Sequence, residues 1–288
     1  MQQAPHTSEH VKSAVVVAHP GHEVRIHGWL ERERPRVFIL TDGSGRVGEP
    51  RIASTNEYLK RFDLRPAHIY GRFTDLEVYD ALLRRDFGLL VGLSEELAGA
   101  LVADGVGRVV GDASEGYNTT HDVCRLVINA AVELARGAGG GREVESYDYP
   151  VVKRPDHCPE HLRARSLWLH LDEEAFRRKL AAAFEFYPQL ATETQEALSG
   201  RGLDGASRHF KLDGDEHAAT DFRGLDMFRV ECLRPVSAGD APFEGECPFY
   251  ELVGEGKVAD GLYKSVIRYR EHLAPLADAL RENIERKT

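Results

Sequence analysis

Near its N-terminus the chain reads SAVVVAHPGHE over residues 13–23. Residues 13–18 form a short apolar run rich in β-branched side chains, and the run ends at a His-Pro-Gly turn. This pattern is typical of a buried parallel strand followed by a turn. Ligands bind beyond the carboxyl ends of the strands in open parallel sheets, so the sequence predicts an active pocket around His19 and His22.

Strands and helices are predicted to alternate after this first strand. Helices are expected over 23–33, 52–62, 75–85, 95–103 and 123–136, and strands over 37–40, 88–92 and 106–110. Such alternation predicts an α/β fold with a Rossmann-like, mostly parallel sheet flanked by helices on both faces.

The pattern changes beyond residues 137–141, where four glycines predict a surface loop. Helices are expected over 172–187, with Asp172 as the N-cap, over 192–198 and over 262–284, whereas 201–256 is rich in loop-forming residues. We therefore expect a flexible N-terminal segment at 1–12 and a single α/β domain at 13–288. This domain would comprise a Rossmann-like core at 13–136 and a helical, loop-rich C-terminal extension at 142–288.

The composition excludes several classes of protein. The 288 residues include 47 acidic and 37 basic side chains, which give a net charge of −10. No nucleic-acid partner is expected, because binding to phosphates depends on Lys and Arg. No apolar run approaches a membrane span and the N-terminus lacks a signal peptide, so we expect no membrane partner and a cytoplasmic protein. The four cysteines form no C-x-x-C pair and suggest free thiols; homo-oligomer formation is left open.

Two more loops bring polar side chains to the same expected sheet edge. The loop after the second strand contains Asp42 and leads to Arg51, and the loop after 106–110 leads to His121. The second of these loops and its end also carry Glu115, Tyr117, Asn118 and Asp122. Imidazoles that converge on one pocket suit a borderline metal such as Zn²⁺. Each residue also has a purely structural interpretation, such as a turn for Asp42.

The A-H-P-G-H-E stretch at 18–23 resembles the A-H-P-D-D-E motif of the PIG-L/LmbE family, which are zinc-dependent N-deacetylases of N-acetylglucosamine conjugates and related amides. Residues 41–43 with Arg51 resemble the family's second-strand loop, 115–121 its H-P-D-H loop, and 176–190 a later helix. The similarity extends over most of residues 13–200. It implies that 13–288 is a deacetylase-like domain that takes a small-molecule substrate.

Transferred position by position, the resemblance makes His19 and His121 zinc ligands and puts His22 in the place of the family's aspartate ligand. It thus implies a three-histidine site for Zn²⁺ or another divalent metal. Gly21 occupies the position of the family's general base. Glu23 and Asp122 are our candidates to replace that base, with Asp112 and Glu115 as further candidates; Glu23 alternatively orients a ligand.

We therefore expect a metal-dependent hydrolase of a C–N bond, an amide or N-acetyl bond, in a small polar substrate such as an amino sugar. Its substrate-binding residues would be Asp42, Arg51, Glu115, Tyr117 and Asn118. The altered motif also permits a relative that binds a sugar, a nucleotide-like ligand or a partner enzyme without deacetylating it. Other metal-assisted chemistry, of the lyase or transferase type, is a third alternative.

Overall fold

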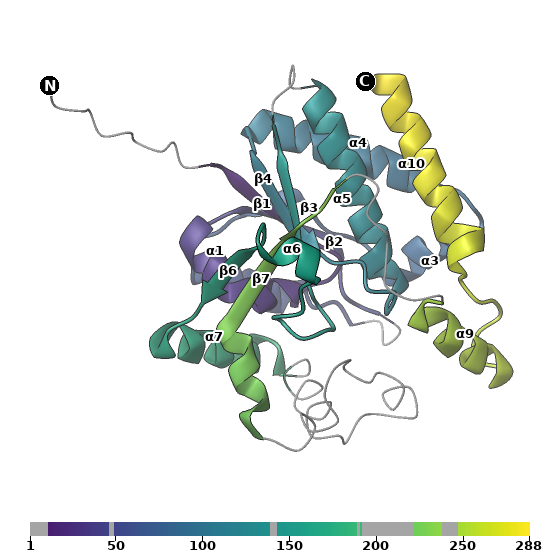
Figure 1. Cartoon of the computed structure of the whole chain (residues 1–288). Helices are drawn as coiled ribbons and strands as arrows, with labels where there is room; N and C mark the ends of the chain where they lie inside the picture. Colours follow the sequence, from purple (N-terminus) through teal and green to yellow (C-terminus); the bar gives the residue numbers. More distant parts are fainter. Residues whose placement is uncertain (1–10, 46–48, 139–142, 189–190, 192–221, 238–246) are drawn as a thin grey trace, which may run out of the picture.

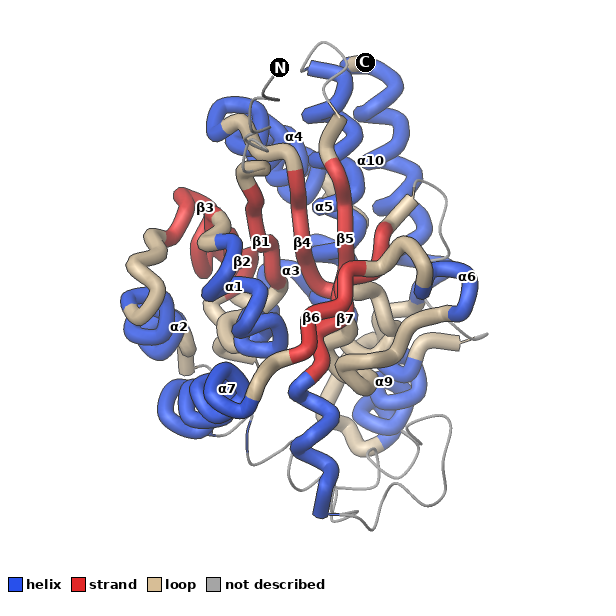
Figure 2. The backbone as a smooth tube through the Cα atoms, turned by 60° about the vertical axis from the view of Figure 1, so that its left-hand side comes forward, coloured by secondary structure: helices blue, strands red, loops and turns tan. Residues whose placement is uncertain are grey.

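The computed structural model describes residues 11–45, 49–138, 143–188, 191, 222–237 and 247–288. Its centre is a seven-stranded sheet in the order β3-β2-β1-β4-β5-β7-β6 (Figures 1 and 2). The parallel strands are β1 (Ser13–Val17), β2 (Arg36–Thr41), β3 (Pro66–Phe73), β4 (Arg108–Asp112) and β5 (Glu145–Tyr149). β7 (Val230–Pro235) runs antiparallel to β5 and to β6 (Leu167–His170). The predicted mostly parallel α/β architecture is confirmed.

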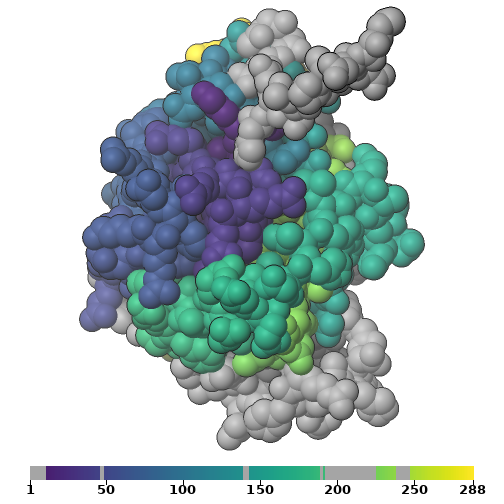
Figure 3. Space-filling model, turned by 90° about the vertical axis from the view of Figure 1, so that its left-hand side faces the viewer, coloured from purple at the N-terminus to yellow at the C-terminus, as the bar shows by residue number. Residues whose placement is uncertain are grey.

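Helices cover both faces of this sheet (Figure 2). One face packs against α3 (Asp75–Leu83), α4 (Gly88–Asp104), α5 (Thr119–Ala138) and α10 (Ala274–Lys287). The other face packs against the 3-10 turn η1 (His22–Ile26), α1 (His27–Glu33), α2 (Ile52–Lys60) and α7 (Glu173–Phe186). Figure 3 views the side on which residues of the N-terminal half, in purple and blue, lie against residues 143–188, in teal and green.

The central position of β1 explains why the residues that follow Ser13 in this strand are all apolar. Val16 and Ala18 pack into the core beneath α4 and α5, whereas Val15 and Val17 pack into the core beneath α1 and α2. Successive side chains of a strand point to opposite faces, so a central strand between two helical layers buries all of them. Each fully buried valine stabilises the fold by roughly 1.5–3 kcal/mol, so the position of β1 and of the residues that directly follow it is well fixed.

The strand predicted over 88–92 is wrong, because these residues form the first part of α4. A short apolar run does not by itself distinguish a buried strand from a buried helix. The helical spacing is visible only over the longer segment, where the buried face consists of Leu90, Leu93, Leu97 and Leu101. The helix ends at Gly105, which has the left-handed φ of 68° typical of a residue that follows a helix.

The remaining differences lie mostly in the C-terminal part. β5, β6 and β7 were not predicted, and α9 (Phe249–Ala259) lies partly inside the segment interpreted as loops. The closing helix is α10, which is preceded by a π-helical turn, η4 (Tyr269–Leu273), and therefore begins later than residue 262. Two short helices, α6 (Glu160–Arg163) and the 3-10 helix η3 (Phe222–Arg229), complete the described elements. The predicted helix over 192–198 and most of the Gly-rich segment lie outside the described residues.

Among the described helices, none is both long enough and apolar enough to cross a bilayer.

Candidate metal centre

The centre lies where the strand order reverses between β1 and β4. β1 continues into His19 and the turn that carries His22, while β4 leads through a loop to α5, whose first turn carries His121. Because β1 and β4 are neighbouring parallel strands, their carboxyl ends lie at the same edge of the sheet. This is the position at which open α/β sheets bind ligands.

The three imidazoles lie next to one another. The ring centroids of His22 and His121 are 4.5 Å apart, and the centroid of His19 is 5.1 Å from each of them. All three are buried, with 5–8% of each residue exposed. One nitrogen from each ring lies within 4.8 Å of the other two. No other group of three His, Cys, Asp or Glu side chains has such spacing in the part of the chain that the structure describes.

Two buried carboxylates hold two of the rings in fixed orientations. Oδ1 of Asp75 lies 2.7 Å from Nε2 of His19, and Oδ2 of Asp112 lies 2.7 Å from Nδ1 of His22. These bonds leave Nδ1 of His19 and Nε2 of His22 as the nitrogens available to a ligand. Carboxylates that hydrogen-bond the far nitrogen of an imidazole are a common support for metal-binding histidines.

Both carboxylates are themselves held in place. Thr120 donates its hydroxyl to Asp75 at 2.9 Å, and Gly45 donates its N–H to the other oxygen at 3.0 Å. Asp112 accepts the N–H of Ala18 at 2.8 Å through Oδ2 and the hydroxyl of Tyr149 at 3.2 Å through Oδ1. Burial acts to raise the pKa of each carboxyl, yet the hydrogen bonds and the adjacent histidines outweigh burial and lower both pKa values. Both groups are therefore carboxylates at neutral pH.

Burial favours the neutral form of two of the three histidines. It lowers the pKa of His22 although Asp112 acts to raise it. It lowers the pKa of His121 well below the usual value, and His22, His19 and Arg51 lower it further. Neutral imidazoles at neutral pH are the form that binds metals.

The residues present fit a metal ion. Nδ1 of His121 is buried without a hydrogen-bond partner among the described residues, which is costly unless a ligand satisfies the nitrogen. Three imidazoles that leave further positions open match the ligand number of catalytic zinc sites. The structure thus contains a cluster of residues able to hold a metal ion.

Glu23 lies beside this cluster, but both of its oxygens are in use. Oε2 accepts the N–H of Gly21 at 2.8 Å, and Oε1 accepts the hydroxyl of Tyr187, which also lies 2.8 Å from the hydroxyl of Thr55. Burial raises the pKa of Glu23 against these hydrogen bonds. The carboxyl therefore braces the turn between His19 and His22, in which Gly21 has a φ of 105° that favours glycine.

Asp122 follows His121 on α5 and is 1% exposed. Its Oδ1 accepts the N–H groups of Glu115 at 3.1 Å and Gly116 at 3.3 Å, whereas its Oδ2 has no hydrogen-bond partner among the described residues. Burial raises the pKa of Asp122 to about 7. Unlike Glu23, Asp122 thus has one oxygen without a hydrogen bond to the described residues, and the nearby Ser114 side chain acts to lower its pKa.

Of the two predicted residues that follow β2, Arg51 lies nearer the cluster. Its charge lowers the pKa values of His22 and His121, and its Nε is buried without a partner among the described residues. Asp42 accepts the N–H of Ser44 at 2.9 Å through its side chain and the N–H of Arg51 at 2.8 Å through its backbone. Asp42 thus shapes the turn from which Arg51 extends.

The other predicted binding residues make contacts that support neighbouring segments of the fold. Glu115 accepts three backbone N–H groups of residues 151–153, at 2.8–2.9 Å. Asn118 accepts the N–H of Thr120 at 2.8 Å at the start of α5. Tyr117 is 38% exposed and stacks on Phe249, with ring centroids 5.3 Å apart. None of these contacts brings the three residues to the imidazoles.

Asp75 was not among the predicted site residues, and its only visible signal was its place at the start of a predicted helix. Asp112 was predicted as a candidate base and not as the partner of His22. Asp75 follows β3, a strand that was not predicted, and Asp112 ends β4, so only the fold shows which imidazole each one contacts.

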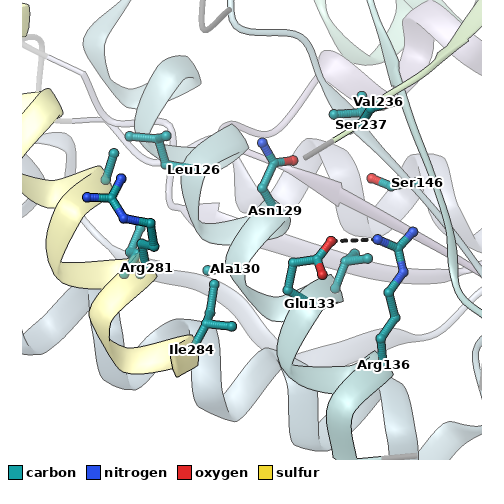
Figure 4. Close-up of a pocket in the computed structure, with 13 residues that line it drawn as sticks. Leu126, Asn129, Ala130, Glu133, Arg136, Ser146, Val236, Ser237, Arg281 and Ile284 are labelled. Atoms are coloured by element: carbon teal, nitrogen blue, oxygen red, sulfur yellow. Dashed lines mark hydrogen bonds and ion pairs between the residues drawn. The ribbon is translucent and has the colours of Figure 1, made fainter. Parts of the chain in front are cut away.

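A cleft of about 220 Å³ lies elsewhere, between α5, α10 and the strands β5 and β7 (Figure 4). Asn129 and Glu133 of α5, Ser146 of β5 and Arg281 of α10 are among the residues that line it. None of the three clustered histidines lines this cleft. This cleft is therefore separate from the candidate metal centre.

No protein-family model and no curated protein matches the sequence. Among solved structures, the chain is similar to the zinc-inhibited form of teicoplanin deacetylase Orf2, with 15% identity, a TM-score of 0.49, and coverage of 80% of this chain and 100% of that chain. It is similar to the conserved protein TT1542 from Thermus thermophilus, with 17% identity, a TM-score of 0.45 and coverage of 82% and 100%. It is also similar to the pseudoaglycone deacetylase Dbv21, with 16% identity, a TM-score of 0.42 and coverage of 83% and 100%. Similarities of this size carry no conclusion about activity.

Proposed function

We propose that this chain is a zinc-dependent hydrolase that cleaves an amide or N-acetyl C–N bond in a small polar substrate of the amino-sugar class. The observation that carries the proposal is the convergence of His19, His22 and His121, with one nitrogen of each within 4.8 Å of the others. The resemblance of residues 18–23 to the A-H-P-D-D-E motif supplies the reaction class. A bound zinc ion would polarise the substrate carbonyl and lower the pKa of a water molecule.

Residues of the chain would orient the metal ligands, accept a proton and position the turn between His19 and His22. Asp75 and Asp112 fix the orientation of His19 and His22, so that these rings present defined nitrogens to the metal. We assign proton acceptance to Asp122, because it keeps an oxygen without a partner among the described residues. Glu23 becomes a positioning residue of the turn, since Gly21 and Tyr187 engage both of its oxygens.

Arg51 would be the main substrate-binding residue. Its guanidinium acts electrostatically on two of the clustered histidines and has a buried nitrogen available for a polar substrate group. Tyr117, which is partly exposed in the loop that leads to His121 and stacks one face on Phe249, would offer its other face to a sugar ring. Asp42, Glu115 and Asn118 would act on the substrate indirectly, by shaping the loops that carry Arg51 and His121.

The test is metal analysis of protein purified without chelator, combined with an assay of acetate release from N-acetylglucosamine and its conjugates. We expect about one zinc ion per chain, and acetate release that stops on chelation and resumes when zinc is restored. His161→Ala is the matched control, because His161 is an exposed histidine of α6 outside the cluster. Protein that folds but takes up no metal would rule the hydrolase out.

One observation favours a second candidate function, binding without turnover. Gly21 has no side chain at the position of the family's general base, and both oxygens of Glu23 are engaged. A chain with bound zinc that releases no acetate, yet binds N-acetylglucosamine in calorimetry, would support this alternative. Substitution of Asp122 separates the two: Asp122→Asn should lower turnover of the hydrolase by roughly 10²–10⁴-fold and leave sugar binding by the non-hydrolytic relative unchanged.

A further inference from the structure

Two of the four cysteines lie near the same serine, well away in sequence from the histidines. Cys158 lies in the segment that leads into α6, and Cys232 lies in the middle of β7. Sγ of Cys158 lies 3.3 Å from the hydroxyl of Ser166, and both Cys158 and Ser166 lie close enough to the Cys232 thiol to act on its pKa. Both are free thiols.

The backbone geometry accounts for this proximity. Cys232 and Arg234 are two residues apart on β7, so their side chains lie on the same face of the strand. Arg234 donates to the carbonyl oxygen of His157 at 3.4 Å and to Asp148 at 2.7 Å. It therefore holds the residue directly before Cys158 over the same face of β7 from which the Cys232 thiol projects.

The other end of the segment is fixed as well. Ser166 donates its hydroxyl to the carbonyl oxygen of Leu162 at 2.9 Å, at the end of α6. β6 starts directly after Ser166 and pairs with β7, with Trp168 opposite Cys232. Cys158 is thus positioned against Cys232 by contacts on both sides.

The two thiols differ in access to solvent. Cys158 is half-buried, whereas Cys232 is 1% exposed. Burial raises the pKa of Cys232 to about 12, with the Cys158 thiol acting in the same direction. A reagent from solvent would therefore meet Cys158 first, and Cys232 would be the second thiol to react.

We propose that Cys158 and Cys232 are a redox-active pair that a hydroperoxide converts to a reversible disulfide. The Cys158 thiolate attacks one peroxide oxygen and the O–O bond breaks, which yields a sulfenic acid and, after proton transfer, an alcohol or, from hydrogen peroxide, one water. The Cys232 sulfur then attacks the sulfenic sulfur, the S–O bond breaks, and a water molecule leaves as the S–S bond forms. Two thiols are oxidised and one hydroperoxide group is reduced.

The disulfide would act on a segment that contacts the candidate metal centre indirectly. Residues 151–153 precede Cys158 and hold Glu115 through three backbone N–H groups. Arg25 of η1 also donates to the carbonyl oxygens of Val151 and Lys153. A covalent link from Cys158 to β7 would therefore tether the segment that contacts the loop leading to His121.

The experiment uses the full chain with Cys247→Ser as the working background, because Cys247 is exposed and would otherwise form links between chains. The reduced protein is treated with hydrogen peroxide, its free thiols are counted after denaturation, and its peptides are mapped by mass spectrometry. We expect two thiols to disappear, one cross-linked peptide pair containing Cys158 and Cys232, and full reversal by dithiothreitol. The oxidised protein should also unfold several degrees higher than the reduced protein, because the link restricts the unfolded chain.

Cys158→Ser in this background should keep Cys232 and Cys124 reduced under the same treatment and should show no peroxide-dependent rise in the unfolding temperature. If Cys158→Ser fails to fold, the peptide map of the Cys247→Ser protein, which retains Cys158 and Cys232, still tests the proposal. A map in which Cys158 is oxidised only to the sulfinic acid, or in which Cys232 stays a free thiol, would overturn the proposal. The outcome is independent of metal content and of acetate release.

Discussion

Two groups of buried polar side chains lie beside the segment formed by η1 and α1, and they differ in how completely their atoms are paired. The histidine cluster leaves a buried nitrogen of His121 without a partner among the described residues. In the second group, Glu231 of β7 accepts the N–H groups of Gly28 and Trp29 at 2.9 Å each and an ammonium hydrogen of Lys179 at 2.8 Å. Lys179 also donates to the carbonyl oxygen of Arg25 at 2.6 Å.

The difference separates a structural role from a functional one. Burial lowers the pKa of Lys179 while Glu231 acts to raise it, and the paired groups tie α7, β7 and the start of α1 together. A fully paired buried cluster stabilises the fold and offers nothing to a ligand. An incompletely paired one is costly until a ligand completes it, which is why the histidines are the candidate centre.

The largest expected effect is the loss of zinc affinity when one of the three metal-binding histidines is removed. For His121→Ala we expect zinc affinity to fall by at least about a thousandfold, or about 4 kcal/mol, because two imidazoles remain where three were present. Zinc titration by calorimetry or with a chromophoric chelator measures it. His161→Ala should bind zinc as tightly as the wild type does. Equal zinc affinities for His121→Ala and the wild type would show that the histidine cluster is not the zinc site.

The second prediction breaks the paired cluster instead. Glu231→Gln leaves Lys179 buried without its counter-ion, so we expect the unfolding free energy to fall by about 3 kcal/mol. Urea unfolding of the zinc-free protein measures this. The double variant Glu231→Gln, Lys179→Met removes both charges and should recover part of the loss. If Glu231→Gln reduced zinc affinity more than it reduced stability, the proposed separation between the two clusters would be wrong.

The sequence predicted the unpaired cluster better than the paired one. His19 and His22 follow an apolar strand within four residues of each other, so a local motif revealed them. Glu231 and Lys179 are 52 residues apart and are joined only by the fold. β7 escaped prediction for the same reason, since it carries Glu231 and Arg234, and charged residues in a strand are explained only by their partners Lys179 and Asp148.

The strands that were missed have weak local patterns. β3 contains Pro66 and Gly71, which are uncommon inside strands, and it lies at the edge of the sheet, where such residues are tolerated. β1 was predicted because burial on both faces selects an unbroken apolar run. Local patterns thus predicted the three neighbouring strands β2, β1 and β4 and missed the strands on either side of them, and the histidines follow β1 and β4.

The third prediction concerns the carboxylates behind the histidines. Asp112→Asn removes the negative charge beside His22 and weakens the hydrogen bond that orients the His22 ring. We expect zinc affinity to fall by about 10–100-fold, or about 2 kcal/mol. Asp75→Asn should act similarly through His19. The same calorimetric titration measures both, and the paired cluster serves as the control, since Glu231→Gln should leave the affinity unchanged.

The smallest expected effect is a pH dependence at the paired cluster. His27 on α1 is buried near Lys179 and donates to or accepts from the hydroxyl of Tyr58 at 3.0 Å. Burial lowers the pKa of His27 to about 4, Lys179 and Arg178 act in the same direction, and Glu31 opposes them. The unfolded chain, with a pKa near 6.5, therefore binds a proton at a higher pH than the native chain does.

The sign follows from this difference in bound protons. As pH falls from about 7.5 to about 5.5, protonation of His27 stabilises only the unfolded state, so this residue should lower the unfolding free energy by about 1.4 kcal/mol. Other groups titrate in the same interval, so the measurement is the difference between wild type and His27→Asn, which keeps a hydrogen-bonding group near Tyr58. Urea unfolding of the zinc-free proteins at both pH values should show a smaller acid-induced loss in the variant. A loss of equal size in both zinc-free proteins would mean that His27 is protonated in the native state, and burial would then not keep this imidazole neutral.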